Sequence, residues 1–116
     1  MSITIGNPSF IPMQGSGGNT TLHTSVNRTQ ITAHNIQNNA VEEVSVSIYR
    51  STSSNSADGD IIDTLIIAAG SEKDVTALIG QGLAADEFIV GVVNTGGIGL
   101  GAVVSSLTYT EFTAGS

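Results

Sequence analysis

The sequence of 116 residues contains no cysteine and no tryptophan. Without cysteine, the chain can form neither a disulfide bridge nor a zinc site built on thiolates. Aromatic side chains are scarce, with two tyrosines and three phenylalanines. Sugar-binding sites commonly use exposed aromatic platforms, and strong interfaces use aromatic anchors. This composition therefore favours contacts made by aliphatic side chains and backbone hydrogen bonds.

Charged residues are also scarce, at 11% of the chain, whereas soluble domains contain about 25%. Only Arg28, Arg50 and Lys73 are basic, against ten acidic residues, which gives a formal net charge of −7. Nucleic acids and anionic membranes are bound through clustered Lys and Arg, and the sequence has no such cluster. The sequence thus predicts no nucleic-acid partner and no membrane partner. A weakly charged surface costs little to bury, which favours protein partners.

Long apolar runs are missing as well. No run approaches the ~20 residues that cross a bilayer. Residues 1–8 lack the basic leader and apolar stretch of a signal peptide. We therefore expect a protein that is made in the cytoplasm and not secreted by a signal peptide. Hydrophobic residues still make up 40% of the chain, enough for one folded domain of this length.

What the sequence does contain is a succession of β-strand patterns. Val44, Val46 and Ile48 alternate with polar residues, the period of a half-buried strand. Residues 61–69 and 87–93 are apolar on both faces, which predicts cover from a second sheet or a neighbouring subunit. Further strand patterns occur at residues 2–5, 22–26, 29–37 and 102–112, and residues 74–79 fit a strand or one helical turn. This even spacing predicts an all-β fold, a single antiparallel β-sandwich or jelly roll of about seven to eight strands.

The first twenty residues are predicted to form an extended N-terminal arm, ahead of a β-sandwich domain of residues 21–116. A glycine-rich stretch at residues 15–18 predicts flexibility within the arm. Apolar side chains have little use in a disordered arm, so we expect the arm to dock on a neighbour. The predicted interface consists of the arm's apolar residues and one from each two-faced strand: Ile3, Ile5, Phe10, Ile11, Met13, Ile66 and Ile89.

Three groups of residues are candidates for chemical sites. His23 and His34 lie on separate predicted strands, with no spacing that indicates a metal site. Asp58, Asp60 and Asp63 could gather around calcium, but their spacing departs from the EF-hand loop and favours a solvated turn. Residues 96–101 are glycine-rich but lead into a strand pattern, which predicts a loop and no phosphate site. The sequence therefore predicts no catalytic, cofactor or metal site, and no enzyme.

Residues 31–112 resemble a family of small β-sandwich virion proteins of tailed bacteriophages. The resemblance rests on the order of strands and turns, with matching segments at residues 33–38, 44–49, 61–65, 83–89 and 106–111. The resemblance implies a structural component of the virion, most often a head decoration or cement protein that stabilises the head exterior. It also implies a homotrimer whose partners are itself and the major capsid protein or other virion proteins. The alternatives are a small tail or collar protein and an adhesin-like, carbohydrate-binding β-sandwich.

Overall fold

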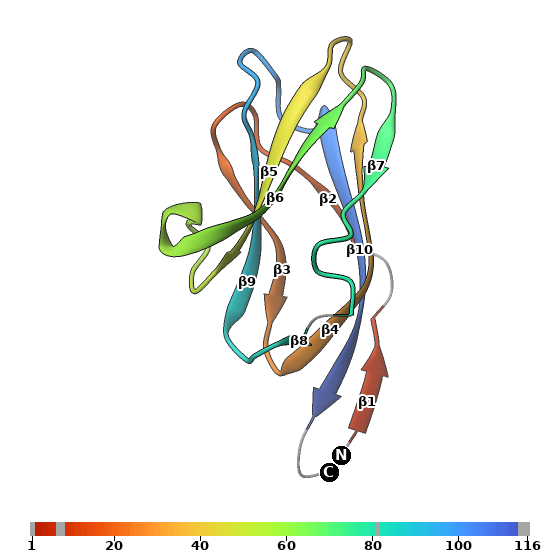
Figure 1. Cartoon of the computed structure of the whole chain (residues 1–116), viewed down its shortest axis with the longest axis vertical. Helices are drawn as coiled ribbons and strands as arrows, with labels where there is room; N and C mark the ends of the chain where they lie inside the picture. Colours follow the sequence, from red (N-terminus) through yellow and green to blue (C-terminus); the bar gives the residue numbers. More distant parts are fainter. Residues whose placement is uncertain (1, 7–8, 81, 114–116) are drawn as a thin grey trace.

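The computed structural model describes residues 2–6, 9–80 and 82–113 (Figure 1). The fold is all-β, as predicted, and the described residues form ten strands and one 3₁₀ turn. In chain order they are β1 (Ser2–Ile5), β2 (Ser9–Pro12), β3 (Asn19–Ser25), β4 (Arg28–Asn38), β5 (Val44–Ser51), η1 (Ser56–Asp58), β6 (Gly59–Ile67), β7 (Glu72–Asp74), β8 (Gly82–Leu83), β9 (Glu87–Val93) and β10 (Val103–Thr113). Within this described part, no helix has the length and apolar character needed to span a bilayer.

The strands form two packed antiparallel sheets. The first sheet has the order β1-β10-β4-β7, with β2 also on β10 and β8 also on β4. The second sheet has the order β3-β9-β5-β6. β1 and β2 occupy successive stretches of one edge of β10, and β7 and β8 do the same on β4. Ten strands therefore fill eight positions, which agrees with the predicted seven to eight.

The pairing identifies the sandwich as a jelly roll. β5 pairs with β6, β4 with β7 and β8, β3 with β9, and β2 with β10. This nested series is one long antiparallel hairpin. The hairpin is rolled up so that β10 also meets β4 and β9 also meets β5. Such rolling yields the two four-position sheets of a jelly roll.

The core lies between the two sheets and is almost wholly aliphatic. Its members come from both sheets and from the loops that connect them. Gly91 on β9 makes room for two of them, because a Cβ there would come within 2.6 Å of Met13 Cε and 3.0 Å of Leu22 Cδ1. The fully buried side chains with the largest volumes are Met13, Ile31, Ile36, Ile48, Ile67, Leu78, Leu83, Ile89 and Leu107.

The predicted division into an arm and a sandwich differs from the structure. β1 and β2 pair with β10 of the same chain, and Met13 is only 1% exposed. The glycine-rich stretch is a hydrogen-bonded turn, in which Gly17 N donates to Val93 O at 2.8 Å and Ser16 N to Ile98 O at 3.0 Å. The described residues before β3 are thus part of the sandwich. The sequence pattern did not predict this pairing, because it does not show that the partner strand of β2 lies about ninety residues further along the chain.

The burial of side chains on the two faces of β5 and β6 also differs from the prediction. Val46 points into the core, as its alternation predicts, but Ser47 on the other face is also buried. Asn94 Nδ2 donates to Ser47 Oγ at 2.7 Å, so the outer face is covered at this point. β6 is an edge strand, with Ile67 buried and Ile66 48% exposed. Among the described residues, no second sheet covers the apolar outer face of β6, and the other predicted source of cover, a neighbouring subunit, stays a prediction.

Candidate functional site

Several large apolar side chains are exposed on a surface with few charges. Single exposed apolar residues are ordinary, but contiguous ones on one face indicate contact surfaces. The exposed large hydrophobic residues are Ile3, Phe10, Val26, Val41, Ile61, Ile66, Ile79 and Leu100. The strand register determines which of them share a face.

Two of them lie on the outer face of the first sheet. Ile3 on β1 is directly opposite Phe112 on β10, and Phe10 on β2 is directly opposite Ser106. Residues directly opposite on antiparallel strands share a face, and so do alternate residues of β10. We call Ile3, Phe10 and Phe112 the outer stripe. Its two ends are six residues apart on β10, about 20 Å at the usual rise of a strand. Figure 1 shows β1 and the end of β10 side by side at one end of the molecule.

A single cation lies at the far end of the outer stripe. The guanidinium carbon of Arg28 is 5.1 Å from the centroid of the Phe112 ring, a cation–π contact. Arg28 is opposite Phe112 on the neighbouring strand β4, so the contact belongs to the same outer face. The stripe thus combines two aromatic rings and one aliphatic side chain, with the positive charge of Arg28 beside it.

Six of the seven predicted interface residues separate into three groups. Ile3, Phe10 and Ile66 are exposed, with exposed fractions of 62%, 71% and 48%. Ile11 is partly buried against the core, while Met13 and Ile89 are core residues with exposed fractions of 1% and 0%. The prediction is wrong for Met13 and Ile89, because their side chains are used in packing the two sheets. The side chain of Ile5 lies outside what the structure describes.

Both histidines point into the sandwich, which the sequence pattern does not predict. A β-bulge between Thr21 and His23 turns the consecutive residues Leu22 and His23 to the inner face of β3. A second irregularity, where Thr32 has no partner on β10, changes the phase of β4 and turns His34 inward. A one-residue change of phase moves all following side chains to the other face. Strict alternation therefore could not find these positions.

Few polar groups surround the two rings. His34 Nε2 lies 2.8 Å from Ser105 Oγ, and the His23 ring is 4.6 Å from the Tyr109 ring between centroids, at a tilt of 47°. Among the described residues, two buried side-chain nitrogens have no hydrogen-bond partner, His23 Nε2 and His34 Nδ1. Burial, with a smaller effect from His23, lowers the pKa of His34 to about 4. Burial also lowers the pKa of His23, partly offset by the carboxylate of Glu111.

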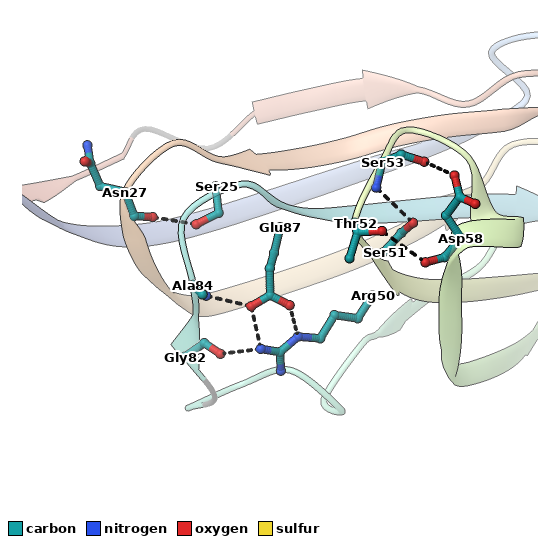
Figure 2. Close-up of polar contacts among 10 residues, drawn as sticks. All are labelled: Ser25, Asn27, Arg50, Ser51, Thr52, Ser53, Asp58, Gly82, Ala84 and Glu87. Carbon is teal, nitrogen blue, oxygen red and sulfur yellow. Dashed lines mark hydrogen bonds and ion pairs between the residues drawn. The ribbon is translucent and has the colours of Figure 1, made fainter.

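A bidentate ion pair between Arg50 and Glu87 lies near β8 (Figure 2). Arg50 Nε and Nη2 donate to the two carboxylate oxygens of Glu87 at 2.7 Å each, and Nη2 also donates to Gly82 O at 3.2 Å. The hydrogen bonds from Arg50 are the main cause of a lowered pKa of Glu87. Ala84 N donates to Glu87 Oε1 at 2.7 Å. These contacts fasten the segment around Gly82 and Ala84 to β5 and β9, which is a structural role.

Asp58, one of the three aspartates considered for calcium, is hydrogen-bonded within its own turn. Ser53 Oγ donates to Asp58 Oδ2 at 2.6 Å, and the Asn55 side chain caps η1 by accepting from Ala57 N (Figure 2 shows the contact of Asp58). No group of three or more His, Asp or Glu side chains in the described ranges is arranged around a common metal position.

A pocket of about 200 Å³ opens beside β4 and is lined by Thr32, Ala33, His34, Asp74, Val75, Thr76 and Ile79.

Comparison with known proteins assigns no family. No protein-family model and no curated protein matches the chain. Among solved structures, the chain is similar to one in a structure of infectious bursal disease virus, Gx strain, with a TM-score of 0.38 and 16% sequence identity. The alignment covers 95% of this chain and 32% of that chain, so this chain spans about a third of the length of the protein it matches. Similarity of this degree assigns no function.

Proposed function

We propose that the protein is a structural component of a tailed-phage virion, a decoration or cement protein on the outside of the head. The outer stripe is the observation that carries this proposal. Phe10 and Ile3 expose more than half of their surface on a chain with only 11% charged residues. The resemblance of residues 31–112 to small virion proteins supports the same role, and a jelly roll is a frequent fold of viral structural domains. Because folds host many functions, the surface carries more weight than the fold.

Attachment through the outer stripe fits its chemistry. Phe10 and Phe112 offer aromatic anchors of the kind that dominate binding energy once water is excluded. The stripe is on the side of β10 that faces away from the core, so a partner can cover it without any rearrangement of the sandwich. The proposed role needs no catalytic group and no cofactor.

Cosedimentation with heads tests the attachment. Heads assembled from the major capsid protein of the same genome are mixed with purified protein and pelleted. We expect the native protein to pellet with the heads and Phe10→Asp to lose at least 90% of this binding, because a carboxylate would be buried in the contact. Val41→Asp is the matched control, since Val41 is 99% exposed and lies on the loop between β4 and β5. Native protein that stays in the supernatant would contradict the proposal.

We further propose that the protein assembles as a homotrimer through the outer face of β6. Ile61 and Ile66 are opposite Tyr49 and Ser45 of β5, on the face turned away from the core. Both are about half exposed, on an edge strand that pairs with β5 on one side and, among the described residues, with no strand on the other. The threefold state is what the family resemblance implies.

Sedimentation equilibrium tests the oligomeric state. We expect a trimer for the native protein at micromolar concentration and a monomer for Ile66→Asp, because an unpaired carboxylate would be buried in the subunit contact. Val41→Asp should remain trimeric. A native protein that is monomeric both in solution and on heads would contradict the trimer, whatever the result of the attachment experiment.

A further inference from the structure

Both histidines of the chain lie where the neutral imidazole is favoured over the charged one. Each ring contributes one buried nitrogen with no hydrogen-bond partner among the described residues, His23 Nε2 and His34 Nδ1. A protonated imidazole donates from both nitrogens, so protonation would place a donor and a charge at a site with no acceptor. The structure is therefore built around the neutral form of both rings.

One ring contacts the opposite sheet and the other contacts a neighbouring strand of its own sheet. His23 is on β3 of the second sheet and packs against Tyr109 on β10 of the first sheet. His34 is on β4 and forms a hydrogen bond with Ser105 on the adjacent strand β10. The rings are close enough that charge on His23 disfavours charge on His34. Protonation of both would create like charges between β3, β4 and β10.

The charged and titratable groups near the rings do not offset the cost of protonating the two imidazoles. From β10, Tyr109 contacts His23, and Glu111 favours the charged form of His23, an effect smaller than that of burial. From β7, Asp74 lines the same pocket as His34, but it accepts a hydrogen bond from Asn35 Nδ2 at 3.0 Å. His34 is among the residues that line this pocket, although only 3% of its surface is exposed.

We propose that His23 and His34 form an acid-sensitive latch, which holds β3 against β10 and β4 when neutral and opens this contact when protonated. The inference concerns the fold itself and stands apart from the proposed place of the protein on a virion. A buried group that titrates in mildly acid solution is a means by which proteins couple packing to pH.

The sign of the effect follows from the lowered pKa values. The unfolded chain takes up protons below pH 6.5, while folded His34 does so only near its pKa of about 4. Stability is therefore fully present above pH 6.5 and falls as the pH decreases from 6.5 toward 4. For His34 alone, these values correspond to a decrease of about 30-fold in the folding equilibrium constant between pH 7.5 and pH 5.

Nuclear magnetic resonance titration of the imidazole Cε1–H signals tests the latch in the native protein. We expect both histidines to titrate below 6.5, with His34 the lower. Gln37→His supplies an internal reference, because Gln37 is exposed on the same strand β4 and its imidazole should titrate near 6.5. If His23 and His34 titrate together with this reference signal, the proposal is overturned.

Urea unfolding between pH 7.5 and pH 5 provides the second measurement. We expect His34→Gln to remove about 30-fold of the pH dependence of the folding equilibrium constant, and an unchanged pH dependence would refute the latch. Hydrogen exchange at pH 5 locates the opening. Protection should be lost first in β3, β4 and the second half of β10, and retained in β5 and β6. Uniform loss over both sheets would overturn the proposal.

Discussion

Deletion of residues 2–13 is expected to prevent the isolated domain from folding at room temperature. The deletion removes β1 and β2, which pair with most of the outer edge of β10, and it removes Met13 from the core. Loss of a buried methionine side chain alone costs about 2–5 kcal/mol. Since domains of this size are stable by about 5–15 kcal/mol, the added loss of the β2 ladder should exceed the available stability.

Thermal unfolding followed by circular dichroism measures this effect. Deletion of residues 2–5 is the matched control, because it removes β1 but keeps β2 and Met13. We expect this shorter deletion to fold and to melt only a few degrees below the native protein, consistent with a loss of about 1 kcal/mol. A domain that lacks residues 2–13 and melts with the native protein would show that the N-terminal strands do not belong to this sandwich.

The second large effect is expected from a carboxylate placed at Ile67. Ile67 is fully buried between the sheets, whereas Ile66, its neighbour on β6, is 48% exposed on the outer face. Ile67→Asp should lower the free energy of unfolding by at least 4 kcal/mol, about the cost of an unpaired buried carboxylate and a lost core side chain. Ile66→Asp should change it by less than about 1 kcal/mol in the monomer.

The two variants differ by one position on one strand and carry the same substitution, so they isolate the effect of burial. Urea unfolding at neutral pH, at a protein concentration low enough to keep the chain monomeric, provides both values. Equal losses would mean that both faces of β6 are buried in the folded chain, contrary to the structure.

Much of the strand content could be predicted because it depends on local periodicity. The alternation of Val44, Val46 and Ile48 predicted a strand, and the structure has β5 at Val44–Ser51. The patterns at residues 29–37 and 87–93 correspond in the same way to β4 and β9. The ambiguous residues 74–79 are a mixed case, where β7 ends at Asp74 and Ile79 makes only an isolated bridge with Ile31.

The candidate surface was predicted in part. Apolar residues in a polar arm predict contact with a partner, and two of them, Ile3 and Phe10, are exposed on the outer stripe. The same reasoning failed for Met13, whose partner is the core of its own chain. A hydrophobic pattern shows that a side chain will be buried, but it does not show whether the cover comes from the same chain or from another.

The sequence by itself determined the composition-dependent properties of this protein: an all-β chain without disulfides, with few charges and a strong acidic excess. These follow from residue types and from a period of two, which any short window displays. Only the tertiary structure decided the jelly-roll pairing of β2 with β10, the inward aim of His23 and His34, and the division of apolar residues between core and outer stripe. The physical reason is that strand partners far apart in sequence are selected by packing of the whole chain. A bulge of one residue then reverses a strand's faces without leaving a mark in its composition.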